Sequence, residues 1–182
     1  MKPTKRLPLF IVTGASCAGK STACEILFRE ETDYIVLESD VIWNDVYDTP
    51  DDDYRAYRQV QLRLCAHIAQ AGKPVVLVSG TTPKQQEPLP ERALFCEIHY
   101  LAVVCDDDTM LDRVTSGRNI ADQAHLTSSL HFNRWLKEHA AATTPPMQLL
   151  DNTNLTPEET AKKVDAWIRA AMEEHDHSTS RG

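Results

Sequence analysis

One short segment, residues 14–21, constrains the fold of this chain more than any other. It reads Gly-Ala-Ser-Cys-Ala-Gly-Lys-Ser and matches the pattern G-x-x-x-x-G-K-[ST] at every defined position. An apolar run, Leu9–Thr13, precedes it and a helical pattern over residues 22–29 follows, which is the setting that the pattern needs. Glycines let such a loop curl so that backbone N–H groups point at phosphate oxygens, and the helix N-terminus adds positive potential. The segment therefore predicts a phosphate-binding loop between a strand and a helix.

The residue types in this loop predict separate tasks. Lys20 is expected to reach the β- and γ-phosphates of a nucleoside triphosphate, and the Ser21 hydroxyl is expected to bind Mg²⁺. ATP and Mg²⁺ are therefore the expected cofactors. We expect the nucleotide to be held by the loop and the first helical turn, namely Gly14, Ala15, Ser16, Cys17, Ala18, Gly19, Lys20, Ser21 and Thr22.

The size and charge of the chain limit the remaining function classes. With 182 residues it has the size of one domain, and we expect residues 1–174 to form that domain and residues 175–182 a disordered polar tail. Nineteen basic residues against 27 acidic ones give a net charge of −8. Nucleic acid and anionic membranes bind preferentially to basic surfaces, so neither is an expected partner of this acidic chain. A small phosphorylated ligand needs only a local patch of positive potential.

The sequence carries no targeting signal that we can identify. Its apolar runs are far shorter than the ~20 residues that a membrane helix needs. The basic start is not followed by the cleavage site of a secretory signal. The cysteines lack Cys-x-x-Cys spacing, and reduced thiols in the cytoplasm are the plain interpretation for Cys17, Cys24, Cys65, Cys96 and Cys105.

Apolar runs alternate with amphipathic stretches along the chain. The runs cover residues 9–13, 34–37, 74–78, 98–105 and 147–150. Several are β-branched and continuous, which is typical of parallel strands buried on both faces. Helical patterns cover residues 50–71, 106–117, 127–140 and 157–171. The first of these is expected to be capped by Thr49, and the second to turn Leu111 inward. The alternation predicts an α/β fold in three layers, with a five-stranded, mostly parallel sheet between helices.

The stretch from Leu9 to about Met172 resembles the small P-loop kinases of the nucleoside/nucleotide-kinase-like superfamily. Gluconate kinases, chloramphenicol phosphotransferases and the nucleoside-kinase or AAA-like families belong to this group. The phosphate loop carries the similarity, together with the Asp-x-x-Trp pattern at residues 40–43 and the segment 132–136. The resemblance implies a P-loop NTPase fold with a small lid, and a single kinase domain over residues 1–174.

The resemblance also implies site residues. Asp40, at the end of the second run, corresponds to the acid that these kinases place beside the acceptor hydroxyl. Arg113 and Arg118 look like their lid arginines, which would act in catalysis. The segment 149–153 resembles their adenine-side loop, so Asn152 and Thr153 are implied to bind the nucleotide.

The residues by themselves leave alternatives open. Asp40 could instead cap a short helix over residues 41–46, although open α/β sheets bind ligands where its strand ends. The third run ends without an acid, so Asp40 is also expected to join Ser21 at Mg²⁺. The two arginines could simply interact with the C-terminal dipole of their helix.

The start of the long helix offers further candidates. Arg55 and Arg58 could hold an anionic substrate or could be solvated. Trp43, Tyr54 and Tyr57 could stack on a base, but packing is the favoured interpretation.

We therefore expect an ATP- and Mg²⁺-dependent kinase that transfers the γ-phosphoryl group to a hydroxyl of a nucleoside or a similar small molecule. One alternative is an antibiotic-modifying phosphotransferase. Another is a regulatory nucleotide-binding switch, although the sequence has no obvious guanine-reading [NT]-K-x-D motif. The identity of the acceptor, the oligomeric state and the choice between ATP and GTP stay open.

Overall fold

The computed structural model describes residues 6–115 and 123–179. The strands are β1 (Leu9–Thr13), β2 (Ile35–Glu38), β3 (Val75–Val78), β4 (Ile98–Val104) and β5 (Gln148–Asp151). The helices are α1 (Lys20–Glu30), α2 (Arg55–Ala69), α3 (Pro83–Gln86), α4 (Asp107–Arg113), α5 (Gln123–His139) and α6 (Pro157–Thr179). Short 3-10 turns cover Ser39–Ile42, Asp45–Tyr47, Pro50–Asp52, Pro90–Leu94 and Ala140–Ala142.

The sheet has the order β2-β3-β1-β4-β5, and every neighbouring pair is parallel. The α/β fold expected from the sequence is confirmed, with a fully parallel sheet in place of a mostly parallel one. Strand β1 lies at the centre, where Val12 pairs with Val78 on one side and with Leu101 on the other. All five β1 residues are buried, which explains why this run is apolar throughout instead of alternating.

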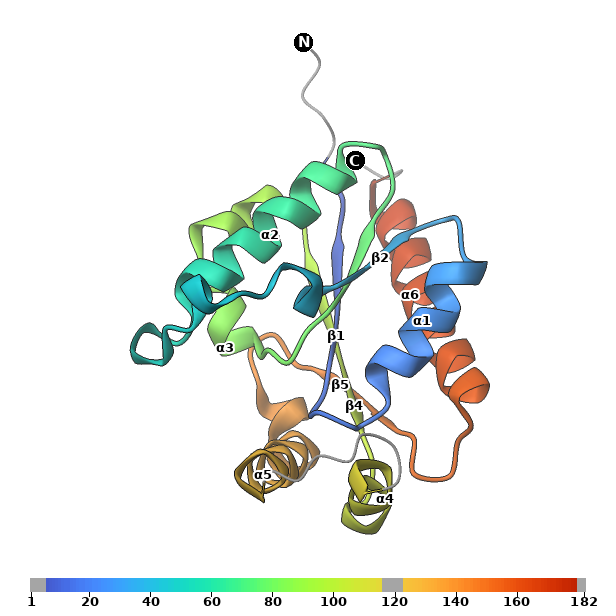
Figure 1. The fold of residues 1–182 in the computed structure, drawn as a ribbon. Coiled ribbons are helices and arrows are strands. Elements are labelled where there is room, and N and C mark those ends of the chain that lie inside the picture. The colour runs from blue at the N-terminus through green and yellow to red at the C-terminus, as the bar shows by residue number, and fades with distance from the viewer. Residues whose placement is uncertain (1–5, 116–122, 180–182) are drawn as a thin grey trace.

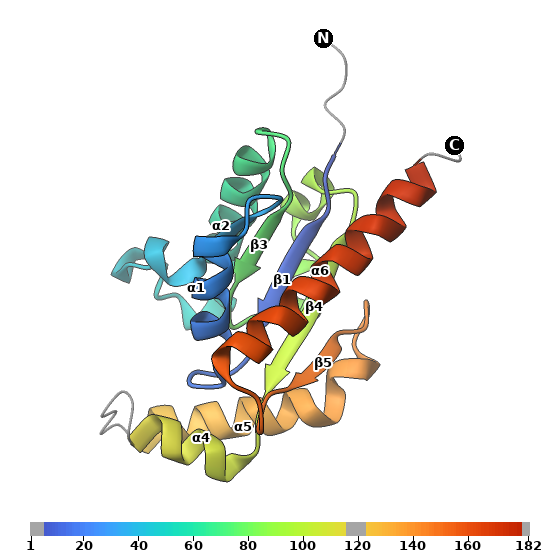
Figure 2. The same ribbon diagram turned by 90° about the vertical axis from the view of Figure 1, so that its right-hand side faces the viewer.

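Helices cover both faces of the sheet (Figures 1 and 2). Leu9 and Ile11 of β1 belong to a core that includes residues of α2, the residues on either side of the turn Pro90–Leu94, and the end of α5. Phe10 and Val12 point to the opposite face, into a core with α1 and α6. Successive β1 side chains therefore alternate between two separate hydrophobic layers.

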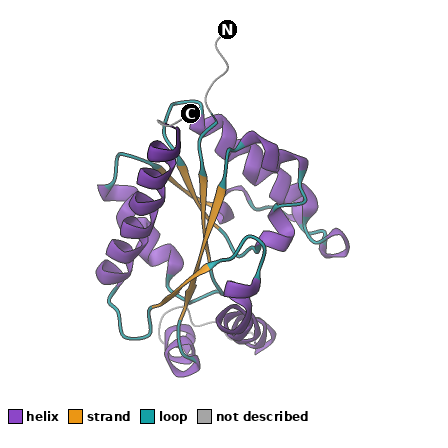
Figure 3. Ribbon diagram, turned by 180° about the vertical axis from the view of Figure 1, so that it is seen from behind, coloured by secondary structure: helices purple, strands orange, loops and turns teal. Residues whose placement is uncertain are grey.

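This topology gathers the functional loops at one edge. Because the strands are parallel, the segments that follow β1, β2, β3 and β5 all leave the sheet at its carboxyl edge. In Figure 3, which views the molecule from behind, α4 and α5 lie beyond that edge of the sheet.

The start of the long helix differs from the sequence expectation. The segment after Thr49 forms only the turn Pro50–Asp52, and α2 begins at Arg55. Asp53 and Tyr54 break the helix between them because both have a φ of 56°, in the left-handed region. The N-cap position of α2 is Tyr54, which makes no side-chain cap bond, and the Asp52 carboxylate accepts the Arg55 amide at 3.3 Å, so the helix begins five residues later than the sequence indicates.

Helices α4 and α6 also differ from the sequence expectation. Met110 of α4 and Val114, directly after the helix, are buried, but Leu111 is 37% exposed, so the expected inward position of Leu111 is wrong. Helix α6 continues to Thr179, so residues 175–179 are helical and are not the disordered tail that we expected. No glycine or proline interrupts residues 158–179, and several residues there are strong helix formers.

Residues 116–122, where the expected lid and Arg118 fall, lie outside the described residues. Over the described ranges, no helix is both long enough and apolar enough to span a membrane.

Candidate functional site

The phosphate loop occupies the turn between β1 and α1. Gly19 precedes α1 with a φ of 93°, a backbone region that favours glycine, and Lys20 is the first helical residue. Cys17, in the middle of the loop, also has a positive φ, of 65°. The Ala18 amide donates to the Ala15 carbonyl at 3.2 Å and closes the loop on itself. The local geometry is therefore the curled loop and helix start that phosphate binding needs.

A cavity of about 840 Å³ opens directly over this loop. Its wall combines residues from every segment of the carboxyl edge: Gly14, Ala15, Ser16, Cys17, Gly19, Lys20, Ser21, Thr22, Asp40, Gly80, Arg113, His125, Ser128, Ser129, Phe132, Asn152, Leu155, Pro157 and Thr160. The structure thus brings Lys20, Asp40, Arg113 and Asn152, which the sequence analysis chose from four distant segments, to one cavity.

Arg113 and Asn152 form a clamp on the phosphate loop. The Ala18 carbonyl accepts two hydrogen bonds, from Asn152 Nδ2 at 2.9 Å and from Arg113 Nη1 at 3.1 Å. Arg113 Nη1 also donates to Asn152 Oδ1 at 3.2 Å, which joins the two donors to each other. A Cβ on Gly19 would lie 2.8 Å from Asn152 Nδ2, so the clamp fits closely against a residue without a side chain. Arg113 therefore holds the loop in addition to lining the cavity.

Asp40 lies at the carboxyl end of β2, within the turn Ser39–Ile42, and is exposed to the cavity. The turn has Glu38 at its N-cap position without a side-chain cap bond, while Asn44 caps the next turn by accepting the Val46 amide at 3.0 Å. The hydrogen bond that Asp40 accepts comes from Ser39 Oγ at 3.4 Å. Asp40 therefore lies inside the turn instead of capping it, and it lines the cavity, while its role toward a ligand stays a prediction.

Helix α5 supplies a wall that the sequence analysis missed. His125, Ser128, Ser129 and Phe132 follow the spacing i, i+3, i+4 and i+7, and so share one helix face toward the cavity. Asn133, on the next position, fixes the helix by donating to the Cys105 carbonyl at 2.8 Å and accepting the Cys105 amide at 3.3 Å. The available signal was a helix face that mixes small polar residues with an aromatic one, in place of an apolar stripe.

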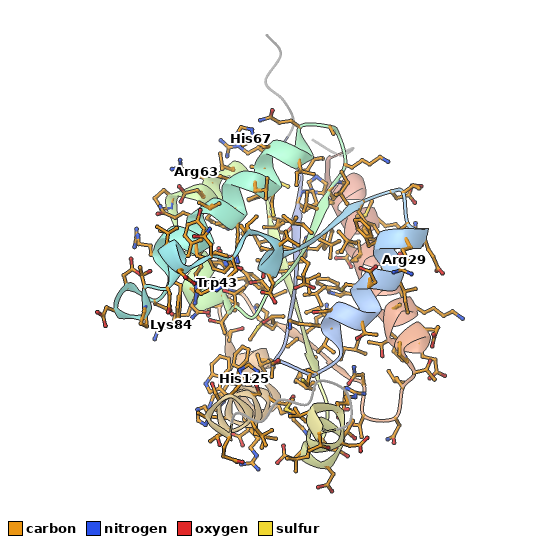
Figure 4. The ribbon with its side chains drawn as sticks, in the orientation of Figure 1. Arg29, Trp43, Arg63, His67, Lys84 and His125 are labelled. Carbon is orange, nitrogen blue, oxygen red and sulfur yellow. The ribbon has the colours of Figure 1, made fainter. Side chains whose placement is uncertain are left out.

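The aromatic residues after β2 pack on one another. Tyr57 contacts Trp43 edge-on, with ring centroids 5.0 Å apart, and Tyr47 at 5.6 Å. The Tyr57 hydroxyl donates to the Ser39 carbonyl at 2.8 Å. Figure 4 shows Trp43 on the side of the molecule that α2 covers. These contacts support the packing interpretation over base stacking.

Three residues that were expected to bind the nucleotide or to act in catalysis are not found on the described cavity wall. Thr153 is absent from the described cavity wall, because its hydroxyl accepts the Asp106 amide at 2.8 Å and donates to Asp151 at 2.6 Å. Ala18 is fully buried behind the loop and contributes its carbonyl to the clamp. Arg118 lies outside the described residues.

Two side chains of the cavity wall, one at the start of α1 and one directly after β2, fit a hard divalent cation. The Ser21 hydroxyl and the Asp40 carboxylate line the same cavity, and both offer oxygen, the donor that Mg²⁺ prefers. No cluster of three or more metal-ligating side chains is found within residues 6–115 and 123–179. Mg²⁺ keeps several waters and is commonly held by few protein groups together with phosphates, so the two oxygen donors Ser21 and Asp40 fit it.

Comparison with known proteins adds a family and a fold. The model of the AAA domain family AAA_33 matches residues 9–116, which is more than half of the chain. No curated protein matches the sequence.

Two solved kinases have similar structures. A sugar kinase from Janibacter sp. HTCC2649 is 17% identical, with a TM-score of 0.69 over 90% of this chain and 95% of its own. A gluconokinase from Sinorhizobium meliloti 1021 is 13% identical, with a TM-score of 0.70 over 96% of this chain and 99% of its own. At this identity the similarity is one of fold, and it extends over nearly the whole length of both proteins.

Proposed function

This chain belongs to the AAA domain family AAA_33, and on that premise we propose that it is a P-loop kinase that uses ATP and Mg²⁺ to phosphorylate a hydroxyl group of a small molecule. One observation carries the proposal. The cavity over the phosphate loop extends past the phosphate side to an exposed carboxylate, Asp40, and to a wall formed by α5. A nucleotide switch needs no such second compartment beside the γ-phosphate.

The phosphate loop and Lys20 bind and orient the triphosphate. Backbone N–H groups and the ammonium neutralise charge that spreads over the phosphoryl oxygens during transfer. Ser21 and Asp40 are the residues that would hold Mg²⁺, which when bound would supply further neutralisation of the phosphate charge.

Asp40 positions the acceptor. Its carboxylate accepts a hydrogen bond from the acceptor hydroxyl and takes the proton as the hydroxyl oxygen bonds to the γ-phosphorus. The bond from the γ-phosphorus to the bridging oxygen breaks at the same time, and ADP leaves. Most of the rate then comes from holding the two reactants in line.

Arg113 acts chiefly through the loop in this proposal. Its two contacts with Asn152 and its contact with Ala18 hold the loop before any nucleotide arrives. Arg118 stays a prediction from the family resemblance, as the residue that approaches the transferred phosphoryl group. A cytoplasmic location is also part of the proposal, and the cysteines, all unpaired, support it.

The direct test measures ADP release from ATP·Mg²⁺ with and without a panel of sugars, nucleosides and hydroxyl-bearing antibiotics. We expect one class of acceptor to raise ADP release and to appear as a phosphorylated product by mass spectrometry. Lys20→Ala is the control and should abolish the acceptor-dependent signal while the fold is kept. ATP hydrolysis that ignores every acceptor but responds to a macromolecular partner would contradict the kinase proposal and favour a switch.

A further inference from the structure

The cavity over the phosphate loop has one end that the acceptor leaves free. In the proposed reaction the acceptor and the γ-phosphate meet at Asp40, so the nucleoside half of the nucleotide extends from the loop in the other direction. There the chain passes from β5 to α6 at the carboxyl edge of the sheet (Figure 2). This part of the wall, the nucleoside end, is formed by Asn152, Leu155, Pro157 and Thr160. Its hydrogen-bonding groups decide whether the protein distinguishes one base from another.

The two polar side chains of the nucleoside end are buried and already bonded. Asn152 is 2% exposed and Thr160 is 1% exposed. Asn152 Nδ2 donates to the Ala18 carbonyl at 2.9 Å, and the Thr160 hydroxyl donates to the Thr156 carbonyl at 2.9 Å. Neither side chain therefore presents a free, exposed donor to a base.

The backbone between β5 and α6 is engaged in the same way. Pro157 has no N–H group, and Asn154 is exposed but is not a residue of the described cavity wall. The other N–H groups of residues 152–156 are bonded within the protein: Asn152 to the Val104 carbonyl at 2.9 Å, Thr153 to Asp151 Oδ1 at 2.9 Å, Leu155 to the Asn152 carbonyl at 3.2 Å and Thr156 to Glu159 Oε2 at 2.8 Å. The backbone donors of the wall at this end are therefore not available to a base.

Arg113 also lines the cavity, but its guanidinium lies against the phosphate loop. Nη1 donates to the Ala18 carbonyl at 3.1 Å, and Nη2 donates to the Asn152 carbonyl at 3.4 Å. A Cβ on Gly19 would lie 3.2 Å from Nη1, which shows how closely the cation approaches the loop. A charge in this place acts on phosphates, and every nucleoside triphosphate carries the same phosphates.

Bases differ in the donors and acceptors along their edges. Adenine carries an amino donor at N6 where guanine carries an acceptor at O6. A site that hydrogen-bonds such an edge rejects the wrong molecule by about 10⁴–10⁵-fold, whereas an apolar site discriminates far less. Among the described residues, the nucleoside end is of the apolar kind, because its accessible side chains are Leu155 and Pro157. Any base can pack on such a surface, since every base has an apolar face.

We infer that the protein does not select the base of its phosphoryl donor, so that GTP, CTP and UTP serve beside ATP. The inference rests on the proposed kinase function. The phosphate loop and Lys20 bind the part that all four nucleotides share, and the base contributes by packing on Leu155 and Pro157. The γ-phosphoryl group passes to the acceptor hydroxyl as before, and the matching nucleoside diphosphate leaves.

Titration calorimetry tests the inference without relying on turnover. The probes are ADP, GDP, CDP and UDP, each with Mg²⁺. One net hydrogen bond to a base is worth about tenfold in Kd, so we expect the four Kd values to lie within about tenfold of one another. Inorganic tripolyphosphate, which has no base, should bind to the same site and compete with ADP.

Leu155→Ala tests the place of the base. It shortens an apolar contact that all bases share, so we expect the Kd values of the four diphosphates to rise by one common factor, about fivefold to tenfold. The Kd of tripolyphosphate should stay unchanged. Leu94→Ala is the matched control, because Leu94 is 45% exposed and is not on the described cavity wall. Its Kd values should all equal those of the wild type. The melting temperature of each variant checks its fold, and the wild-type panel decides the inference even where Leu155→Ala does not fold.

Three results would overturn the inference. The first is a wild type that binds one diphosphate more than about tenfold tighter than another, because the base is then read by at least one hydrogen bond. The second is a folded Leu155→Ala that changes the Kd for some bases and not for others, or for none. The third is an equal loss for tripolyphosphate in that variant, which would place Leu155 on the phosphates.

Turnover separates this inference from the kinase proposal. Equal Kd values in a protein that phosphorylates no acceptor refute the kinase alone. Acceptor-dependent transfer from ATP, in a protein that binds ADP selectively, refutes the lack of base selection alone.

Discussion

The clamp on Ala18 makes a prediction that differs from the usual expectation for a lid arginine. A residue that contacts only the transferred phosphoryl group lowers kcat when it is removed and leaves nucleotide binding nearly unchanged. The structure instead places Arg113 on the Ala18 carbonyl and on Asn152. We therefore expect Asn152→Ala and Arg113→Ala to weaken the binding of ADP as well as of ATP.

The size of the effect follows from the bonds. Asn152→Ala removes one amide–carbonyl bond, worth about 1 kcal/mol, and one bond to a charged donor, worth about 1.5–3 kcal/mol. We expect the free energy of unfolding to fall by about 2.5–4 kcal/mol. The free loop must then be ordered by the nucleotide, and fixing one residue costs about 1–2 kcal/mol. The Kd for ATP and for ADP should each rise about tenfold.

Urea unfolding and titration calorimetry on Asn152→Ala, Arg113→Ala and the double variant measure both quantities. Because the two side chains share one carbonyl and bond to each other, we expect a coupling energy of about 1–2 kcal/mol. Arg169→Ala is the control, since Arg169 of α6 bonds Glu31, directly after α1, and Asp165 of α6, and none of the three lines the described cavity. It should lose stability but keep its nucleotide affinity. A fall in kcat with unchanged ADP binding in Arg113→Ala would refute the clamp as the main role of this arginine.

The remaining predictions concern the acceptor, the lid and the loop thiol. Asp40→Asn should lower kcat by about 10²–10⁴-fold while calorimetry shows intact ATP binding, because the base is lost and the shape is kept; a loss of stability alone would return Asp40 to a structural role. Arg118→Ala should lower kcat more than ATP affinity in steady-state kinetics, and an equal loss of both would place this side chain on the bound nucleotide instead. Iodoacetamide should inactivate the enzyme by adding bulk at Cys17 in the cavity wall, ATP·Mg²⁺ should protect it, and Cys17→Ser should be resistant. Cys96→Ser serves as the exposed-thiol control and should stay sensitive, whereas Cys24 should not react, since burial raises the pKa of its thiol to about 12.

The sheet and the phosphate loop could be predicted because their signals are local. A continuous β-branched run identifies a strand such as Val75–Val78 without knowledge of its neighbours. The start of α2 could not be predicted in this way. Thr49 and Pro50 have the residue types of a helix start, but left-handed backbone at Asp53 and Tyr54 interrupts the helix.

The roles of the site residues depend on contacts between distant segments. The family resemblance was enough to identify Arg113 and Asn152 as candidate site residues. Their hydrogen bonds to the Ala18 carbonyl could not be predicted, because Arg113 lies 95 positions and Asn152 134 positions from Ala18 in the sequence. Nothing in the local pattern around Arg113 shows whether its guanidinium faces a phosphate or a carbonyl.

The hydrogen bond between Asn152 and the Ala18 carbonyl also has a consequence for synthesis, because the phosphate loop is made long before the side chain that holds it. The loop leaves the ribosome early, but the side chain that fixes it follows more than 130 residues later. Until β5 and α6 emerge, Phe10 and Val12 lack part of the core that covers them. A nascent chain of about 150 residues therefore exposes an unfinished apolar layer and a phosphate loop without its full clamp, and we expect its affinity for nucleotide to be lower than that of the folded chain.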